Sequence, residues 1–244
     1  MIQTGKNVTL LTAIVMLIGV CFFVLSACAG NNSAEDESMA KKTRIILIGA
    51  SVGQDWKLKD FTERTQTTGY VFESVAVWQY DKTEAIEEVL MRPKRKFHPT
   101  KTYLKGFFRP SPEPVDIVIL KECAAYFPGD LVQYKELMKK WVSMVRGAGK
   151  EVMIATVAPV TETRASKQEG KIESILAFND WIRRYANEQN ITLLDLEAAL
   201  RKGPETRFLK DELTSGDGTH LNRKAYDILD VLLKDTCRTR LGNS

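Results

Sequence analysis

Residues 44–53 read Arg-Ile-Ile-Leu-Ile-Gly-Ala-Ser-Val-Gly, a continuous aliphatic run followed by two glycines that flank Ser51. A run that is apolar at every position is typical of a strand buried on both faces, as in a parallel sheet covered by helices. Glycines on either side of a polar residue indicate a tight turn. We therefore expect a first strand at Arg44–Ile48, with Ser51 just beyond its carboxyl end.

Further apolar runs alternate with helical patterns along the rest of the chain. The other expected strands are Val71–Val77, Val115–Leu120, Val152–Val157 and Ile191–Leu194. The expected helices are Thr83–Met91, Leu131–Arg146, Ile172–Gln189 and Arg223–Thr236. This alternation predicts an open, five-stranded parallel α/β sheet with helices on both faces. Sites in such sheets lie at the carboxyl ends of the strands, so the residues after each strand are the candidates.

The composition excludes several classes of protein. The chain has 244 residues, of which 44% are hydrophobic and 27% are charged, which excludes a disordered tail, a fibre and a multi-span membrane protein. The net charge of +4 does not predict bulk affinity for nucleic acid. With only two histidines, His98 and His220, a His-rich metal site is not expected, and no motif calls for a cofactor.

The N-terminal segment indicates export. Lys6 is followed by an almost unbroken apolar run from Val8 to Leu25, typical of a signal peptide, although its length also fits an uncleaved anchor helix. The run ends in Leu-Ser-Ala-Cys28, which resembles the bacterial lipobox. We expect a lipoprotein signal at residues 1–27, lipid on Cys28 and a polar tether at residues 28–42. That places the domain, residues 43–240, in the cell envelope, at the periplasmic face of the outer membrane in a Gram-negative cell.

Two separated motifs carry the candidate chemistry. Gly49-Ala-Ser51-Val-Gly53 fits a nucleophile elbow, but also a turn with a capping serine, or a dinucleotide cradle that lacks its third glycine. Asp217-Gly-Thr-His220 precedes the last predicted helix, in a glycine-containing turn that would let the carboxylate fold back toward the imidazole. A carboxylate there would orient a histidine that takes a serine proton. The alternative is a helix start with an incidental histidine.

These motifs together resemble the SGNH (GDSL-type) hydrolases, over about residues 43–236. The resemblance rests on Ile46-Leu-Ile-Gly-Ala-Ser51 and Asp217-Gly-Thr-His-Leu-Asn222, supported by Phe178-Asn-Asp-Trp181 and Ile191-Thr-Leu-Leu-Asp-Leu196. It implies a flavodoxin-like three-layer α/β/α sandwich and an esterase, lipase, thioesterase or carbohydrate deacetylase. It also implies that Ser51 is the nucleophile, His220 the base and Asp217 the acid that orients it.

The chain departs from the family where the oxyanion donors are expected. Val77-Trp-Gln79-Tyr replaces the block that offers a glycine, and Lys121-Glu122-Cys123-Ala124 replaces the block that offers an asparagine. Gln79 or a backbone amide near Cys123 would have to substitute, since one lost donor costs on the order of 10²–10³ in rate. An ionised Glu122 would repel an oxyanion. It either pairs with Lys121 or binds a substrate hydroxyl or amine.

An insertion at residues 92–109 holds seven Lys and Arg residues, Arg92, Lys94, Arg95 and Lys96 among them, and no acidic residue. It predicts either a solvated basic loop or a site for an anionic glycan, lipid head group or protein. Nucleic acid fits this charge but not the compartment. His98 has no acidic neighbour and is not expected to be catalytic.

Cys123 and Cys237 are expected at opposite ends of the sheet, as two separate thiols. Two classes of function remain open. One is a lipid-anchored esterase or deacylase that acts on an acylated glycan or lipid. The other is a catalytically impaired binding or assembly protein that lacks the oxyanion hole.

Overall fold

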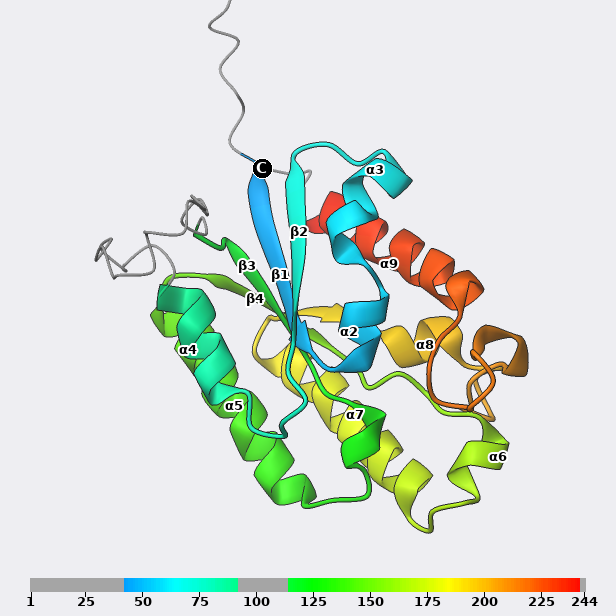
Figure 1. Cartoon of the computed structure of the whole chain (residues 1–244). Helices are drawn as coiled ribbons and strands as arrows, with labels where there is room; N and C mark the ends of the chain where they lie inside the picture. Colours follow the sequence, from blue (N-terminus) through cyan, green and yellow to red (C-terminus); the bar gives the residue numbers. More distant parts are fainter. Residues whose placement is uncertain (1–41, 92–113, 242–244) are drawn as a thin grey trace, which may run out of the picture. The chain divides into compact units, whose positions relative to one another are not determined.

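The computed structural model describes residues 42–91 and 114–241. Their central feature is a parallel sheet of five strands in the order β2-β1-β3-β4-β5. The strands are β1 (Thr43–Gly49), β2 (Tyr70–Ala76), β3 (Ile117–Lys121), β4 (Glu151–Ala155) and β5 (Thr192–Leu194). From β1 the chain crosses to one side to form β2 and then returns to the other side to form β3 (Figure 1). The point where the order reverses is where α/β sheets place their sites.

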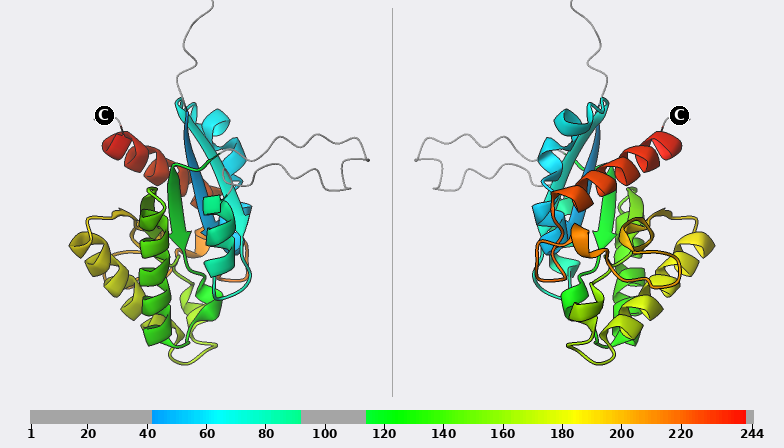
Figure 2. Two further views of the ribbon diagram at one scale, coloured as in Figure 1. Left: turned by 90° about the vertical axis from the view of Figure 1, so that its left-hand side faces the viewer. Right: turned by 90° about the vertical axis from the view of Figure 1, so that its right-hand side faces the viewer.

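Three helices pack against one face of the sheet. The longest described helix packs against the other face, together with several short helices. The first face carries α4 (Thr83–Met91), α5 (Leu131–Gly147) and α7 (Lys171–Glu188). The opposite face carries α2 (Ser51–Asp55), α3 (Phe61–Thr65), α8 (Leu196–Leu200) and α9 (Arg223–Leu241). The two side views in Figure 2 show α5 and α7 in front in one and α9 in front in the other. The short α6 (Glu162–Ala165) lies between β4 and α7 in the sequence, and 3₁₀ turns occur at η1 (Leu58–Asp60), η4 (Ala124–Tyr126) and η5 (Asp211–Leu213).

Side chains of β1 point alternately to the two faces of the sheet, and each face has its own hydrophobic core. Ile46 and Ile48 pack into the cluster under α4, α5 and α7. Ile45 and Leu47 pack into the cluster under α2, α8 and α9. Because successive side chains of a strand point to opposite faces, one aliphatic run supplies both cores. The three-layer, flavodoxin-like arrangement predicted from the sequence is confirmed.

The predicted strands all occur, with small shifts at their ends. The fourth was expected to run to Val157 but ends at Ala155. The reason is local, since the Val157 N–H and carbonyl are both bonded by the Asn179 side chain, at 2.8 and 3.0 Å, instead of extending the ladder. Sequence patterns did not predict α2, α3, α6 or α8, because helices of four or five residues are too short to show a period.

Within the described residues, no helix is long and apolar enough to cross a membrane. The predicted signal segment, Cys28, the tether up to residue 41 and the whole basic insertion at residues 92–109, with His98, lie outside those residues. Cys123 and Cys237 are both buried and free, so the prediction of two separate thiols is confirmed.

Candidate active site

Ser51 lies at the turn between β1 and α2, as its first helical residue, and is 8% exposed. The two glycines around it are closely packed. A Cβ on Gly49 would lie 3.3 Å from the Lys121 carbonyl oxygen of the neighbouring strand, and one on Gly53 would clash with Leu47. Small residues on both sides of the serine thus suit this turn, as they do a nucleophile elbow.

Asp217 and His220 form a compact pair in the loop before α9. Asp217 Oδ2 lies 2.5 Å from His220 Nδ1. Asp217 Oδ1 accepts hydrogen bonds from the backbone N–H groups of Thr219, at 2.9 Å, and His220, at 2.8 Å. The carboxylate thus holds both the loop and the imidazole, which leaves Nε2 as the ring nitrogen available for proton transfer.

These hydrogen bonds also set the charge of the carboxylate. Partial burial would raise the pKa of Asp217, but the backbone N–H groups of His220 and Thr219 and the His220 ring outweigh it. The result is a pKa lowered to about 2. Asp217 is therefore ionised at any pH at which an esterase would work, which is what a group that stabilises an imidazolium requires.

The loop is fastened to its surroundings at several points. Gly218 adopts φ +78°, and its carbonyl accepts from the Thr161 N–H at 2.9 Å. A Cβ at this glycine would collide with the side chains of Thr161 and Arg164. Asn222 Nδ2 donates to the Glu212 carbonyl at 2.7 Å, so the chain is held on both sides of His220.

Ser51 and His220 come from adjoining elements but are not hydrogen-bonded to each other in the part of the chain that the structure describes. His220 lines a pocket of about 470 Å³ together with Asp55 and Trp56, the last residue of α2 and the one after it. Helix α2, which begins with Ser51, therefore borders the histidine loop. The direct Ser51–His220 contact stays a prediction, since such bonds often tighten only when substrate is bound.

The expected substitutes for the oxyanion donors take different positions. Gln79 follows β2 and is exposed, with its backbone carbonyl accepting from Tyr126 Oη at 3.1 Å. Cys123 follows β3 and is buried, with Sγ accepting from the Ala125 N–H at 3.5 Å. The Gln79 side chain is therefore open to solvent, whereas the Cys123 thiol is already used in a local turn.

Glu122 is buried and paired, but not with the predicted partner. Its Oε2 accepts from Lys82 Nζ at 2.7 Å, and neither side chain is more than 1% exposed. The alternative in which it pairs with Lys121 is wrong, because Lys121 Nζ donates instead to the Glu122 backbone carbonyl, at 2.8 Å. Lys82 also lies over the rings of Tyr126 and Trp141.

Burial raises the pKa of Glu122, and Lys82 opposes that rise. Lys121 is also buried, and because burial disfavours the charged form of a side chain, its pKa is lowered. Oε1 of Glu122 is buried without a hydrogen-bond partner among the described residues. The negative charge that would oppose an oxyanion is thus offset by a neighbouring ammonium, and the carboxylate is not exposed to a substrate.

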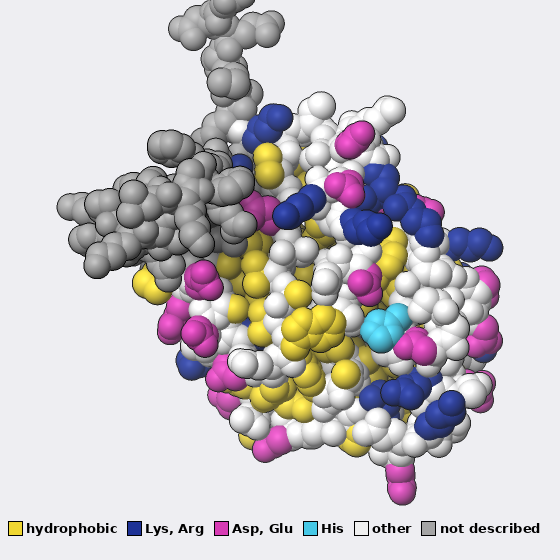
Figure 3. All heavy atoms as spheres, viewed as in Figure 1, with side chains coloured by type: hydrophobic (Ala, Val, Ile, Leu, Met, Phe, Trp, Pro, Cys, Tyr) yellow, Lys and Arg dark blue, Asp and Glu magenta, His cyan; other side chains and the backbone are white. Residues whose placement is uncertain are grey.

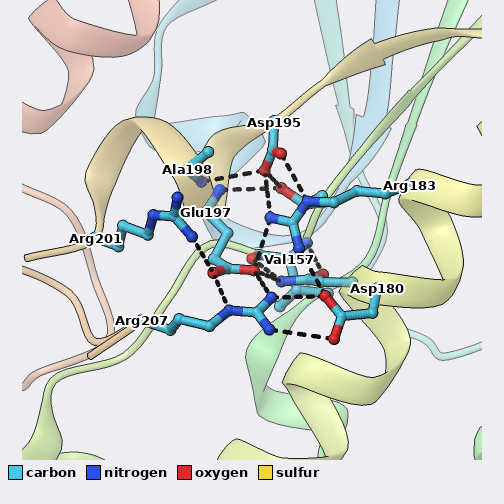
Figure 4. Close-up of polar contacts among 10 residues, drawn as sticks. Val157, Asp180, Arg183, Asp195, Glu197, Ala198, Arg201 and Arg207 are labelled. Atoms are coloured by element: carbon cyan, nitrogen blue, oxygen red, sulfur yellow. Dashed lines mark hydrogen bonds and ion pairs between the residues drawn. The ribbon is translucent and has the colours of Figure 1, made fainter. Parts of the chain in front are cut away.

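A polar cluster that sequence patterns only partly indicated lies beyond the carboxyl ends of β4 and β5 (Figure 4). Arg183 of α7 bonds both Asp195, at 2.8 Å, and the fully buried Glu197, at 2.8 Å. Arg207 joins Glu197 to Asp180. Asn179 links Glu197 to Val157, in the segment that leads to Thr161 and hence to Gly218. The motif Phe178–Trp181 signalled two of these residues, but their partners lie far away in the sequence.

No group of three metal-ligating side chains occurs among the described residues. No protein-family model matches the chain, and no curated protein matches it. Solved structures do resemble it. A GDSL-like lipase from Bacteroides thetaiotaomicron aligns with a TM-score of 0.57 at 16% identity, over 81% of this chain and 88% of its own.

Two further solved structures align over 81% of this chain. The lipase/acylhydrolase from Enterococcus faecalis has a TM-score of 0.55 at 15% identity, over 96% of its own length. A carbohydrate acetylesterase from Sinorhizobium meliloti has a TM-score of 0.55 at 12% identity, over 99% of its length. At these identities the likeness shows a shared fold, the one found in these lipolytic and acyl-ester hydrolases.

Proposed function

We propose that this chain is an SGNH-type ester hydrolase that uses Ser51, His220 and Asp217. The observation that carries the proposal is the Asp217–His220 pair, built by a locally fastened loop beside the helix that begins with Ser51. The shared fold with lipases and a carbohydrate acetylesterase supports the same reaction class. An acylated glycan or lipid is the substrate, and lipid on Cys28 anchors the protein in the cell envelope.

The proposed reaction proceeds in two halves. Ser51 Oγ attacks the ester carbonyl carbon while its proton passes to His220 Nε2, and the Asp217 carboxylate stabilises the imidazolium. The tetrahedral intermediate expels the alcohol, which takes the proton from His220 and leaves an acyl-Ser51. A water molecule then gives a proton to His220 and attacks the acyl carbon. The second tetrahedral intermediate releases the acid, and His220 returns the proton to Ser51 Oγ.

The oxyanion that forms in each half needs donors from the backbone. Ser51 begins α2, and the Gly53 N–H already donates to the Ala50 carbonyl at 2.9 Å. The N–H groups of Ser51 and Val52 are the ones that the start of the helix leaves without an intrahelical acceptor. This end of α2 therefore offers donors beside the nucleophile. The exposed Gln79 amide is the side chain best able to add another from β2. Binding of an anionic ligand by Arg92, Lys94, Arg95 and Lys96 stays a prediction, since these residues lie outside the described part.

The test is hydrolysis of p-nitrophenyl acetate by the purified full-length protein. We expect slow but measurable turnover that Ser51→Ala abolishes, because only the attack requires the hydroxyl. Loss of one neutral hydrogen bond would change ligand binding by only about 0.5–1.5 kcal/mol. A wild-type protein that is inactive on short acyl and acetyl-sugar esters, and whose ligand binding survives Ser51→Ala, would support the binding or assembly protein instead.

A further inference from the structure

Trp78 is a large side chain that remains 64% exposed at the catalytic edge of the sheet. The β1–β2 pairing ends with Gly49 opposite Ala76, and the Val77 N–H then donates to the Gly49 carbonyl at 2.8 Å. Ser51 and Trp78 are therefore each two residues beyond the last pair of two neighbouring parallel strands. Both residues therefore follow the carboxyl ends of adjacent strands, at the same edge of the sheet.

The backbone that carries Trp78 is held on both sides. Tyr126 Oη lies 3.4 Å from the Val77 carbonyl and 3.1 Å from the Gln79 carbonyl, as donor to both. The ring of Tyr80 packs edge-on against that of Tyr126, with centroids 5.7 Å apart. The exposed indole is thus presented by an anchored segment, and holding it in water has no structural benefit, because burial of so large a side chain would stabilise the fold.

The surroundings of the serine indicate what the indole contacts. Figure 3 shows hydrophobic side chains at the surface between α4 and α2. The pocket of about 470 Å³ beside His220 has a mixed lining, in which the apolar Trp56 and Leu221 lie with the hydrogen-bonding side chains of Asp55, Lys57, Ser215 and Arg223. Asp55 is one helical turn from Ser51 on α2. A long acyl chain prefers apolar walls, whereas charged and hydroxyl groups next to an aromatic face suit a sugar.

We propose that Trp78 is a specificity-determining platform for a pyranose ring that carries the ester. The C–H face of the ring lies on the indole, the ring hydroxyls bond the charged side chains of the His220 pocket, and the O-acyl group is presented to Ser51. This inference rests on the proposed function and narrows its substrate class to acylated glycans. The indole touches the alcohol part of the ester, not the acyl group.

The test compares two acetyl esters on the full-length protein, a monoacetylated methyl pyranoside and ethyl acetate, whose alcohol part has no ring. Trp78→Ala is expected to raise KM for the pyranoside about tenfold, which corresponds to about 1.4 kcal/mol. It should raise KM for ethyl acetate much less, because ethanol has no ring to lie on the indole. Trp78→Phe should fall between. Val132→Ala, at another exposed apolar side chain on α5, is the matched control and should change neither ester.

An equal rise in KM for both esters, or a raised KM for ethyl octanoate alone, would overturn the inference. Calorimetric binding of the pyranoside to Ser51→Ala, with and without Trp78→Ala, separates it from the proposed function. Trp78-dependent binding by a protein that hydrolyses no ester would sustain the platform and refute the hydrolase. Hydrolysis of the pyranoside that requires Ser51 but is unchanged by Trp78→Ala would support the hydrolase and refute the platform.

Discussion

The Asp217 carboxylate accepts three hydrogen bonds, two from the backbone of its own loop and one from the His220 ring. Asp217→Asn keeps the hydrogen bonds from the backbone but changes the contact with the His220 ring. The amide oxygen still accepts from the backbone, but the NH₂ group now faces Nδ1 and favours the wrong tautomer. We expect kcat to fall on the order of 10³–10⁴-fold. Thermal stability should fall less than in Asp217→Ala, because the backbone hydrogen bonds to the side-chain oxygen remain. Asp217→Ala should lower both, and a thermal melt measured beside the kinetics checks the difference.

The lowered pKa of Asp217 adds a pH dependence. A carboxyl group whose folded-state pKa lies below its unfolded value contributes stability above the unfolded value and loses it as pH falls through the folded value. The stability difference between wild type and Asp217→Asn should therefore be constant above the ordinary pKa of 3.8 and shrink only as pH approaches about 2. A difference that disappears near neutral pH would contradict the assigned charge.

The buried Lys82–Glu122 pair is a second residue-scale test. Lys82→Met leaves the Glu122 carboxylate in the core without its counter-charge, which typically costs about 3–5 kcal/mol of unfolding free energy. Because burial already raises the pKa of Glu122, the carboxyl is most stable in its protonated form, at low pH. The deficit, measured by urea unfolding, should be smaller at about pH 4.5 than at about pH 8. Lys82→Met with Glu122→Gln should recover part of it.

At the scale of elements, the loop before α9 depends on Gly218. Gly218→Ala adds a Cβ against Thr161 and Arg164 at a residue with φ +78°. We expect it to lower the melting temperature and to reduce ester hydrolysis by more than the loss of folded protein explains. Gly216→Ala, with φ +115° but open space, isolates the backbone strain, and Gly147→Ala, with open space at the end of α5, should be neutral. Equal effects at all three glycines would contradict the account.

Strands and helices were predictable from the sequence where a continuous apolar run or a long periodic pattern marked them. The aliphatic run before Gly49 and the periodic residues of α5 and α7 located strands and helices to within a few residues. Asp217 and His220 are three residues apart, so their pairing was visible in the turn between them. The partner of Glu122 was not, because Lys82 lies 40 residues away and meets it only through the fold. The Arg183–Glu197–Arg207 cluster was missed for the same reason.

At the scale of the whole molecule, anchoring is a prediction from the Leu-Ser-Ala-Cys28 ending. Cys28→Ala should leave the chain unlipidated, so that it moves from the detergent phase to the aqueous phase in a partition assay and loses the mass of the acyl groups. The site is predicted to be independent of the anchor, so kcat on p-nitrophenyl acetate should be unchanged. Unaltered partitioning and mass in the variant would refute the lipoprotein assignment.

The central claim is that Ser51 is a nucleophile activated by His220, and covalent labelling tests it most directly. A fluorophosphonate, which phosphonylates activated serines, is incubated with the full-length wild type, with Ser51→Ala and with His220→Ala, and the modified peptide is located by mass spectrometry. The account predicts one adduct on Ser51 of the wild type, none on Ser51→Ala, and labelling of His220→Ala slowed on the order of 10³-fold or more. An unlabelled wild-type Ser51, or labelling that proceeds as fast without His220, would contradict it.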